Sequence, residues 1–183
     1  HDVWDYDLAS PPILADVTVD GRARKIVAQP TKQGFLFVFD RVTGEPIWPI
    51  EERPVEQSEV PSEKTWPTQP FPTKPAPFEL QGTSDDYLID LTPELKREAR
   101  EIAAQYKMGP LFTPPIVRDE DGKRAMLMMP NTRGGANWPG GAIDAETGIV
   151  YIASVSHMTS LALYKPEAAR SDMNYVATYG YTS

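Results

Sequence analysis

Two segments of the chain repeat one pattern, and this repeat restricts the folds that the chain can adopt. They read VFDRVTGEPIW (residues 38–48) and AIDAETGIVYI (residues 142–152). In each, a strand-like run ends at an aspartate, and Thr-Gly follows after two further residues. Asp and Thr side chains accept hydrogen bonds from backbone amides in turns, and Gly supplies a positive φ angle. The repeat predicts two strand–turn–strand units of one design, although two similar β-turns could also arise by chance.

The segments around the repeat predict further short strands. Asp20-Gly21 is a strong hairpin signal between alternating runs. The candidate strands are residues 12–19, 24–30 and 35–40, with a fourth beginning at residues 46–50. Four short strands joined by tight turns match the size of one propeller blade. We therefore assign residues 1–50 to one blade and residues 111–156, which return to strand-like runs, to a second, within a mainly all-β fold.

Residues 51–91 interrupt the strand pattern with a proline-rich excursion. The chain has 19 prolines, about twice the usual share, and proline marks turns and extended segments. A long irregular segment inside a domain is either disordered or a functional covering loop. Trp66, Phe71 and Phe78 lie among the prolines and favour a packed loop over a free linker.

One helix is expected at residues 93–106, and with the excursion it makes up the segment 51–110. Thr92 suits the N-cap, and Pro93 suits the first helical position. Apolar residues follow at helical spacing, and Gly109-Pro110 would end the helix. Residues 157–183 are weakly patterned, so we expect irregular structure or a poorly ordered end there.

Composition excludes several classes of function. The net charge is −8 and no Lys/Arg cluster reaches five residues, so nucleic acid and anionic membrane surfaces are poor partners. Without cysteine, the chain has no disulfide and no thiolate metal site or nucleophile. Its apolar stretches are far shorter than the roughly 18 residues of a membrane span. No initiator methionine opens the sequence, and we expect a piece of a larger protein.

The repeated pattern Asp-x-x-Thr-Gly-x-x-x-Trp resembles the tryptophan-docking motif of quinoprotein dehydrogenases, which are eight-bladed propellers that carry pyrroloquinoline quinone (PQQ). Longer strings, HDVWDYDLASPPILADV, PTKQGFLFVFDRVTGEPIW and GGANWPGGAIDAETGIVYIAS, are similar to the membrane-bound glucose dehydrogenase branch. The resemblance implies a C-terminal portion of such a propeller, about two four-stranded blades. It makes Trp48 a residue that packs between blades. In the second copy Ile152 stands at that place, which weakens the corresponding contact.

The resemblance also assigns roles near the start of the chain. Asp5 matches the catalytic aspartate, a base that removes the hydroxyl proton of the substrate. Lys32 matches the lysine that contacts the PQQ quinone oxygens, where a cation stabilises developing negative charge. Trp4 and His1 would support or pack against the site. Taken without the resemblance, Asp5 reads as a turn or capping carboxylate and Lys32 as an exposed turn lysine.

A glycine-rich loop, PNTRGGANWPGG (residues 130–141), supplies the remaining candidates. The family carries an asparagine here that binds PQQ, and both Asn131 and Asn137 compete for this match. Asn131 is preferred because it directly follows a strand-like run. Trp138 is a nearby site or packing residue, and Arg133 would meet either a PQQ carboxylate or a surface carboxylate.

The resemblance implies a periplasmic PQQ-dependent dehydrogenase that oxidises a sugar, polyol or alcohol and passes electrons to a quinone or another acceptor. Ca²⁺ or Mg²⁺ would accompany PQQ in the parent protein, but the metal ligands and the tryptophan that stacks on PQQ would lie on other blades. We therefore predict no metal ligand in this chain and no turnover by the chain alone. Unpaired sheet edges would recruit the remaining blades or a second copy. The alternative is a non-catalytic scaffold of the same repeat family.

Overall fold

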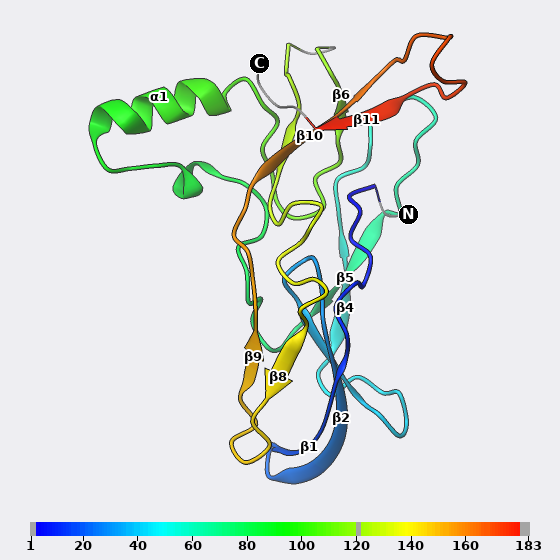
Figure 1. Ribbon diagram of the computed structural model, residues 1–183, viewed down its shortest axis with the longest axis vertical. Coiled ribbons are helices and arrows are strands. Elements are labelled where there is room, and N and C mark those ends of the chain that lie inside the picture. Colours follow the sequence, from blue (N-terminus) through cyan, green and yellow to red (C-terminus); the bar gives the residue numbers. More distant parts are fainter. Residues whose placement is uncertain (1–2, 120–121, 180–183) are drawn as a thin grey trace.

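The computed structural model describes residues 3–119 and 122–179. Its elements are β1 (Ile13–Val19), β2 (Arg22–Pro30), β3 (Leu36–Asp40), β4 (Ile50–Pro54), β5 (Thr68–Pro72), a 3₁₀ turn η1 (Asp85–Tyr87), α1 (Pro93–Ala103), β6 (Ile116–Val117), β7 (Met126–Met128), β8 (Gly141–Ile143), β9 (Val150–Ile152), β10 (Thr159–Tyr164) and β11 (Val176–Tyr179). The molecule is elongated (Figure 1). The β1–β3 meander and the β8–β9 hairpin lie at one end, and β6, β10 and β11 lie at the other. The mainly β prediction with one helix is confirmed.

The strands of the meander β1–β2–β3 turn every second residue inward, so buried positions alternate with more exposed ones along the apolar part of each strand. The strands pair antiparallel, and β1 pairs with β2 from Ile13↔Ala28 to Val19↔Arg22. The connecting turn has positive φ at Asp20 and Gly21, as the hairpin signal predicts. The inward residues of the meander form one buried cluster of Ile13, Ala15, Ile26, Ala28, Leu36 and Val38.

The fourth strand predicted to begin at residues 46–50 does not join the meander as a full strand. Pro46 makes only an isolated bridge to Phe39. Strand β4 begins at Ile50 and pairs with β5 from the proline-rich segment, in a separate hairpin. Pro46 and Pro49 have no N–H to donate to a ladder, which explains why β3 does not gain a full fourth partner. The proline-rich segment is therefore more regular than expected.

Two of the three aromatic residues of the excursion pack as predicted. Phe71 lies edge-on to Phe35 and Phe112, with ring centroids 5.5 and 5.6 Å apart. Phe78 packs against the buried cluster of the meander. Trp66, by contrast, is 62% exposed.

The predicted second blade, residues 111–156, does not form one sheet. Strands β6 and β7 both pair with β10, which also pairs with β11, whereas β8 and β9 form their own hairpin. The prediction of irregular structure for residues 157–183 is therefore wrong at β10 and β11. Strand β10 is short, and its partners β6, β7 and β11 are all separated from it in the sequence. No local pattern therefore indicates its pairing.

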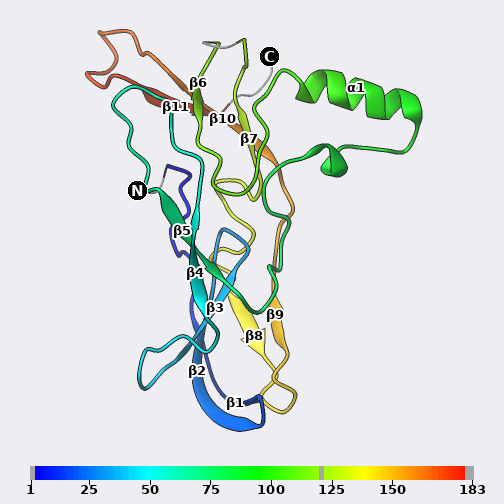
Figure 2. The ribbon, with the colours of Figure 1, turned by 180° about the vertical axis from the view of Figure 1, so that it is seen from behind.

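The helix begins where the sequence predicts. The Thr92 hydroxyl accepts a hydrogen bond from the Leu95 amide at 3.3 Å, and Pro93 is the first helical residue. Helix α1 ends at Ala103, three residues before the predicted end. The chain then turns away, because the Lys107 amide bonds to the Ala125 carbonyl at 2.8 Å. Figure 2 shows α1 projecting from the side of the molecule.

The two copies of the repeat adopt the same turn. The Asp40 carboxylate accepts hydrogen bonds from the amides of Val42 and Thr43 at 2.9 and 3.1 Å. The carboxylate of Asp144 accepts from the corresponding two amides at 2.9 and 3.4 Å. These bonds hold the pKa of both carboxyl groups below the ordinary value. The glycines of the two copies have φ angles of 79° and 72°, so the repeat is a structural one and not a coincidence.

The tryptophan position of the repeat lies where the two copies meet. Trp48 is half-buried and packs against the meander cluster, and so do Ile143, Val150 and Ile152 of the β8–β9 hairpin. Strands β1 and β8 are also in contact. Trp48 and Ile152 thus both take part in the apolar contact between the two repeat units.

Candidate functional site

Three segments that are far apart in the sequence converge on Lys32. They are the N-terminal segment that carries Asp5 and Asp7, the turn of residues 31–34, and the glycine-rich loop. The Lys32 ammonium (Nζ) donates to the Asp5 carbonyl at 2.9 Å, to Asp7 Oδ1 in a short ion pair, and to Asp5 Oδ2 at 3.4 Å. The Lys32 side chain is only 7% exposed, whereas those of Asp5 and Asp7 are 65% and 61% exposed. A buried cation therefore faces two carboxylates that remain open to solvent.

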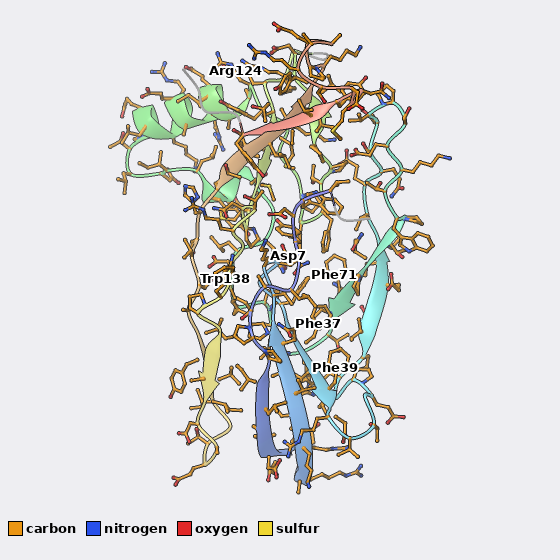
Figure 3. All side chains as sticks on the ribbon, turned by 45° about the vertical axis from the view of Figure 1, so that its right-hand side comes forward. Asp7, Phe37, Phe39, Phe71, Arg124 and Trp138 are labelled. Carbon is orange, nitrogen blue, oxygen red and sulfur yellow. The ribbon has the colours of Figure 1, made fainter. Side chains whose placement is uncertain are left out.

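The N-terminal segment alternates between core and site. Trp4 and Tyr6 are buried, and Asp5 and Asp7 point the other way. The Trp4 indole donates to the Thr113 carbonyl at 2.7 Å, and the Tyr6 hydroxyl donates to a carbonyl of the glycine-rich loop at 2.5 Å. Asp5 has a φ of 63°, a left-handed conformation that is uncommon outside glycine but is found for Asp. These anchors hold the two carboxylates on one face. Figure 3 shows Asp7 near the middle of the long axis.

The turn that carries Lys32 is closed by Thr31. The Thr31 hydroxyl accepts from the Phe35 amide at 3.1 Å, and the Gly34 amide donates to the Thr31 carbonyl at 3.1 Å. Thr31 is fully buried, and Gly34 has a φ of 83°. The turn is therefore rigidly placed, and Lys32 is not the exposed turn lysine that its sequence context suggests.

The glycine-rich loop lies directly against Lys32. The Gly135 amide donates to the Lys32 carbonyl at 2.8 Å. A Cβ atom on Gly134 would lie 2.5 Å from the Lys32 Cα, and closer still to its Cβ and Cγ. Only glycine fits this contact, and the φ of 81° at Gly134 requires it as well.

The charges of the cluster shift each other's titration. Burial lowers the pKa of Lys32, but the hydrogen bond that its ammonium donates to Asp7 and the charges of Asp5 and Asp7 outweigh this effect, so the pKa is raised above its ordinary value. The hydrogen bond from Lys32 is the main cause that lowers the pKa of Asp7. Lys32 and Asp7 therefore remain charged over a wide pH range around neutrality.

The two candidate asparagines differ in where they lie. Asn131 is buried, its amide nitrogen is 2.6 Å from His157 Nδ1, and its Oδ1 accepts from the Arg133 amide at 2.8 Å. The Asn137 amide donates to the Arg133 carbonyl at 2.6 Å, and its Oδ1 accepts from the Trp138 amide at 2.8 Å. The Asn137 side chain thus forms hydrogen bonds to residues of the loop, whereas that of Asn131 also contacts His157 outside the loop.

Of the other expected residues, Trp138 is 82% exposed and Arg133 is also exposed. Figure 3 labels Trp138. Trp4 is buried in an apolar cluster, and His1 lies outside the described residues. The roles assigned to Asp5, Lys32, Asn131, Asn137 and Trp138 remain predictions.

Two residues of this region were missed in the sequence. Asp7 forms a closer ion pair with Lys32 than Asp5 does, and the alternation of WDYD, which places both carboxylates on one side, could have indicated it. Glu79 packs against Gly34 and Gly135. No local signal marks it, because its partners are distant in the sequence.

The donor set around Lys32 fits a quinone in part. An ammonium group has three N–H donors, and here two bonds are short while the third, to Asp5 Oδ2, is 3.4 Å long. One donor could therefore turn to a quinone oxygen without loss of the other two. Among the described residues, the side-chain nitrogen of Asn131 contacts only His157, which leaves one of its two hydrogens for a ligand.

Within residues 3–119 and 122–179, the structure gathers no group of three or more His, Cys, Asp or Glu side chains that could hold a metal ion. In the same ranges, no helix has the length and apolarity needed to cross a membrane.

Comparison with known proteins places the chain in a family. The family model described as PQQ, glucose/ethanol/alcohol dehydrogenase β-propeller domain, matches residues 1–182. The chain is 34% identical over 147 residues to the quinoprotein glucose dehydrogenase of Escherichia coli, covering 79% of this chain and 17% of that protein. It is 32% identical over 151 residues to the glycerol dehydrogenase large subunit of Gluconobacter thailandicus, covering 81% and 20%.

Further relatives extend the same picture. The quinate/shikimate dehydrogenase (quinone) of Acinetobacter baylyi is 30% identical over 153 residues, covering 83% of this chain and 18% of that protein. Among solved structures, a europium-containing methanol dehydrogenase shares the fold with a TM-score of 0.52 and 21% identity, covering 97% of this chain and 23% of that one. The chain thus spans about a fifth of the length of these relatives. It belongs to the PQQ family of glucose/ethanol/alcohol dehydrogenase β-propeller domains, of which it forms a part.

Proposed function

We propose that this chain supplies the base and one quinone-contacting cation to the site of a PQQ-dependent dehydrogenase that oxidises a sugar, polyol or alcohol hydroxyl. The proposal rests on the cluster of Lys32, Asp5 and Asp7, in which a buried cation lies beside exposed carboxylates. A scaffold of the same repeat family would need the turns at Asp40 and Asp144 but no such cluster. The relatives named for glucose, glycerol and quinate support the substrate class.

In the proposed reaction, Asp5 acts on the substrate and Lys32 acts on the quinone. Asp5 takes the proton of the substrate hydroxyl on its carboxylate oxygen, which is open to solvent. Lys32 donates a hydrogen bond to a quinone oxygen, and Asp7 keeps the ammonium charged and in place. Bound PQQ would supply the two-electron acceptor. Asn131 would add a single N–H, while Asn137 and Trp138 shape the loop.

The activity itself is proposed for the complete propeller. The chain covers 17–20% of the relatives named above, so it offers one side of a site that the rest of the ring would complete. The metal, Ca²⁺ or Mg²⁺, would be held by other blades. We expect no dye-linked sugar oxidation from the 183-residue chain with added PQQ and Ca²⁺. Turnover under these conditions would contradict a shared site.

Titration of the metal-loaded parent protein with PQQ, followed by absorbance, tests the cofactor contact. Lys32→Ala should weaken PQQ binding about 10- to 100-fold, the usual effect of losing a hydrogen bond to a charged group. Lys25→Ala, at an exposed lysine of β2, is the matched control and should bind as the wild type does. Wild-type affinity in Lys32→Ala would remove Lys32 from the cofactor site.

A further inference from the structure

We propose that Glu79 is the positioning residue of this site: it clamps the turn of residues 31–34 against the glycine-rich loop and so fixes the Lys32 ammonium between Asp5 and Asp7. The inference rests on the proposed function for its catalytic meaning. Its structural content, the placement of Lys32, can be measured without cofactor or substrate.

The Glu79 carboxylate joins two distant parts of the chain. Its Oε1 accepts from the Ser156 hydroxyl at 2.7 Å and from the Leu80 amide at 2.8 Å, and its Oε2 accepts from the Ser154 hydroxyl in a short bond. The two serines lie just after β9, 75 and 77 residues further along the chain. Glu79 therefore ties the proline-rich segment to the irregular segment between β9 and β10, which follows the second repeat.

The same residue sits in close contact with both elements that border Lys32. A Cβ atom on Gly34 would lie 2.9 Å from the Glu79 Cβ, and one on Gly135 would lie 3.1 Å from it. Both glycines thus leave room for Glu79. Glu79 lies between the turn that carries Lys32 and the loop that packs on Lys32.

Backbone bonds close this frame on both sides. On one side, the Phe78 amide donates to the Gly34 carbonyl at 2.9 Å. On the other, the Val155 amide donates to the Gly135 carbonyl at 3.0 Å, and the Gly135 amide donates to the Lys32 carbonyl at 2.8 Å. A continuous path of backbone hydrogen bonds therefore runs from the segment of Ser154 and Ser156, through the glycine-rich loop, to Lys32.

Glu79 carries out this role as a charged acceptor. Burial raises its pKa, but the bonds from Ser154, Ser156 and the Leu80 amide together outweigh this effect and lower it. Among the described residues, the structure gives Glu79 no ion pair. Its charge is satisfied by hydroxyl and amide donors, which fix direction as well as distance.

Removal of the clamp should loosen the turn relative to the two aspartates. Misplacement of a catalytic group by about 1 Å can cost 100-fold in rate. Glu79→Ala should therefore lower kcat in the parent protein and leave the substrate KM nearly unchanged, because Glu79 contacts no group assigned to the substrate. Glu79→Gln keeps an acceptor for Ser156 and Leu80, and the Ser154 hydroxyl can rotate to accept from the new amide. It should restore most of the activity.

The deciding experiment measures Lys32 itself by NMR in the 183-residue chain, without PQQ. Glu79→Ala should move the pKa of Lys32, followed at its Cε, back toward the ordinary lysine value. It should also speed hydrogen exchange of the Gly135 amide about 10- to 100-fold, as expected when bonds to a charged acceptor are lost. Glu79→Gln should restore both values.

Glu52→Ala is the matched control, because Glu52 also accepts from a hydroxyl, that of Thr68 at 2.6 Å, but on the exposed β4–β5 hairpin. It should leave the Lys32 titration and the Gly135 exchange unchanged. Unchanged Lys32 titration and Gly135 exchange in Glu79→Ala would overturn the proposal, and so would a Gln variant as impaired as the Ala variant. If the NMR effects appear while the wild-type parent protein shows no dehydrogenase activity, the clamp stands and the proposed function fails.

Discussion

Substitution of Gly134 by alanine tests how the candidate site is assembled. The new Cβ would lie 2.5 Å from the Lys32 Cα and even closer to the first two side-chain carbons. One of these atoms belongs to the backbone, so a rotation of the Lys32 side chain cannot remove the clash. Gly134 also has a φ of 81°, which an alanine adopts only at a cost. The loop must therefore move away from the turn that carries Lys32.

The expected cost has two parts that a control can separate. A left-handed backbone costs about 1–2 kcal/mol for a residue with a Cβ, and overpacking at a filled contact costs about 1–3 kcal/mol. Gly134→Ala should therefore lower the free energy of unfolding by about 2–5 kcal/mol. Gly44 has a similar φ of 79° but no atom within 4 Å of an added Cβ. Gly44→Ala should cost only about 1–2 kcal/mol.

Urea unfolding followed by tryptophan fluorescence measures both variants under the same conditions. We expect Gly134→Ala to be less stable than Gly44→Ala, because only Gly134 makes the close contact with Lys32. The pKa of Lys32 should also fall toward its ordinary value only in Gly134→Ala. Equal stability of the two variants, with equal Lys32 titration, would refute the close approach of the loop to the turn.

Three further outcomes follow from the same structure. The free energy of unfolding of the wild type should fall as the pH drops below about 3.8, the ordinary pKa of an aspartate, because the pKa of Asp7 is lowered in the folded state. Asp7→Asn should make the free energy of unfolding less dependent on pH in this range. Trp48→Ala should cost about 2 kcal/mol in urea unfolding, less than the roughly 3–5 kcal/mol of a fully buried tryptophan, since Trp48 is half-buried; no loss would contradict its packing role. Thr92→Ala should cost about 1 kcal/mol through the lost N-cap and should lower helical circular dichroism, and an unchanged spectrum and midpoint would count against that cap.

The features predicted correctly from the sequence are those whose signal is local. Asp40 and Asp144 accept bonds from amides two and three residues away, so each turn is specified within its own segment. The same holds for Thr92 and Pro93 at the start of α1. The fold class followed from these turns and from the resemblance that they revealed.

The features missed depend on distant partners. Strand β10 pairs with β6, β7 and β11, and no periodicity in a six-residue strand identifies three partners. Glu79 meets its serines 75 and 77 residues away. The burial of Lys32 likewise comes from the close contact of Gly134, which a turn sequence does not indicate. Such contacts are set by tertiary packing, which overrides local preference.

Asp5→Asn in the parent protein tests the central claim most directly, with Asp16→Asn as the control. Asp16 is as exposed as Asp5, at 65%, and also pairs with a basic residue, Arg41, but lies on β1. We expect Asp5→Asn to lower kcat of dye-linked alcohol or sugar oxidation about 100- to 10,000-fold, the usual contribution of a general base. The variant should still bind PQQ, as measured by absorbance. Asp16→Asn should retain wild-type kcat. An Asp5→Asn variant that binds PQQ and turns over at the wild-type rate would contradict the assignment of Asp5 as the base.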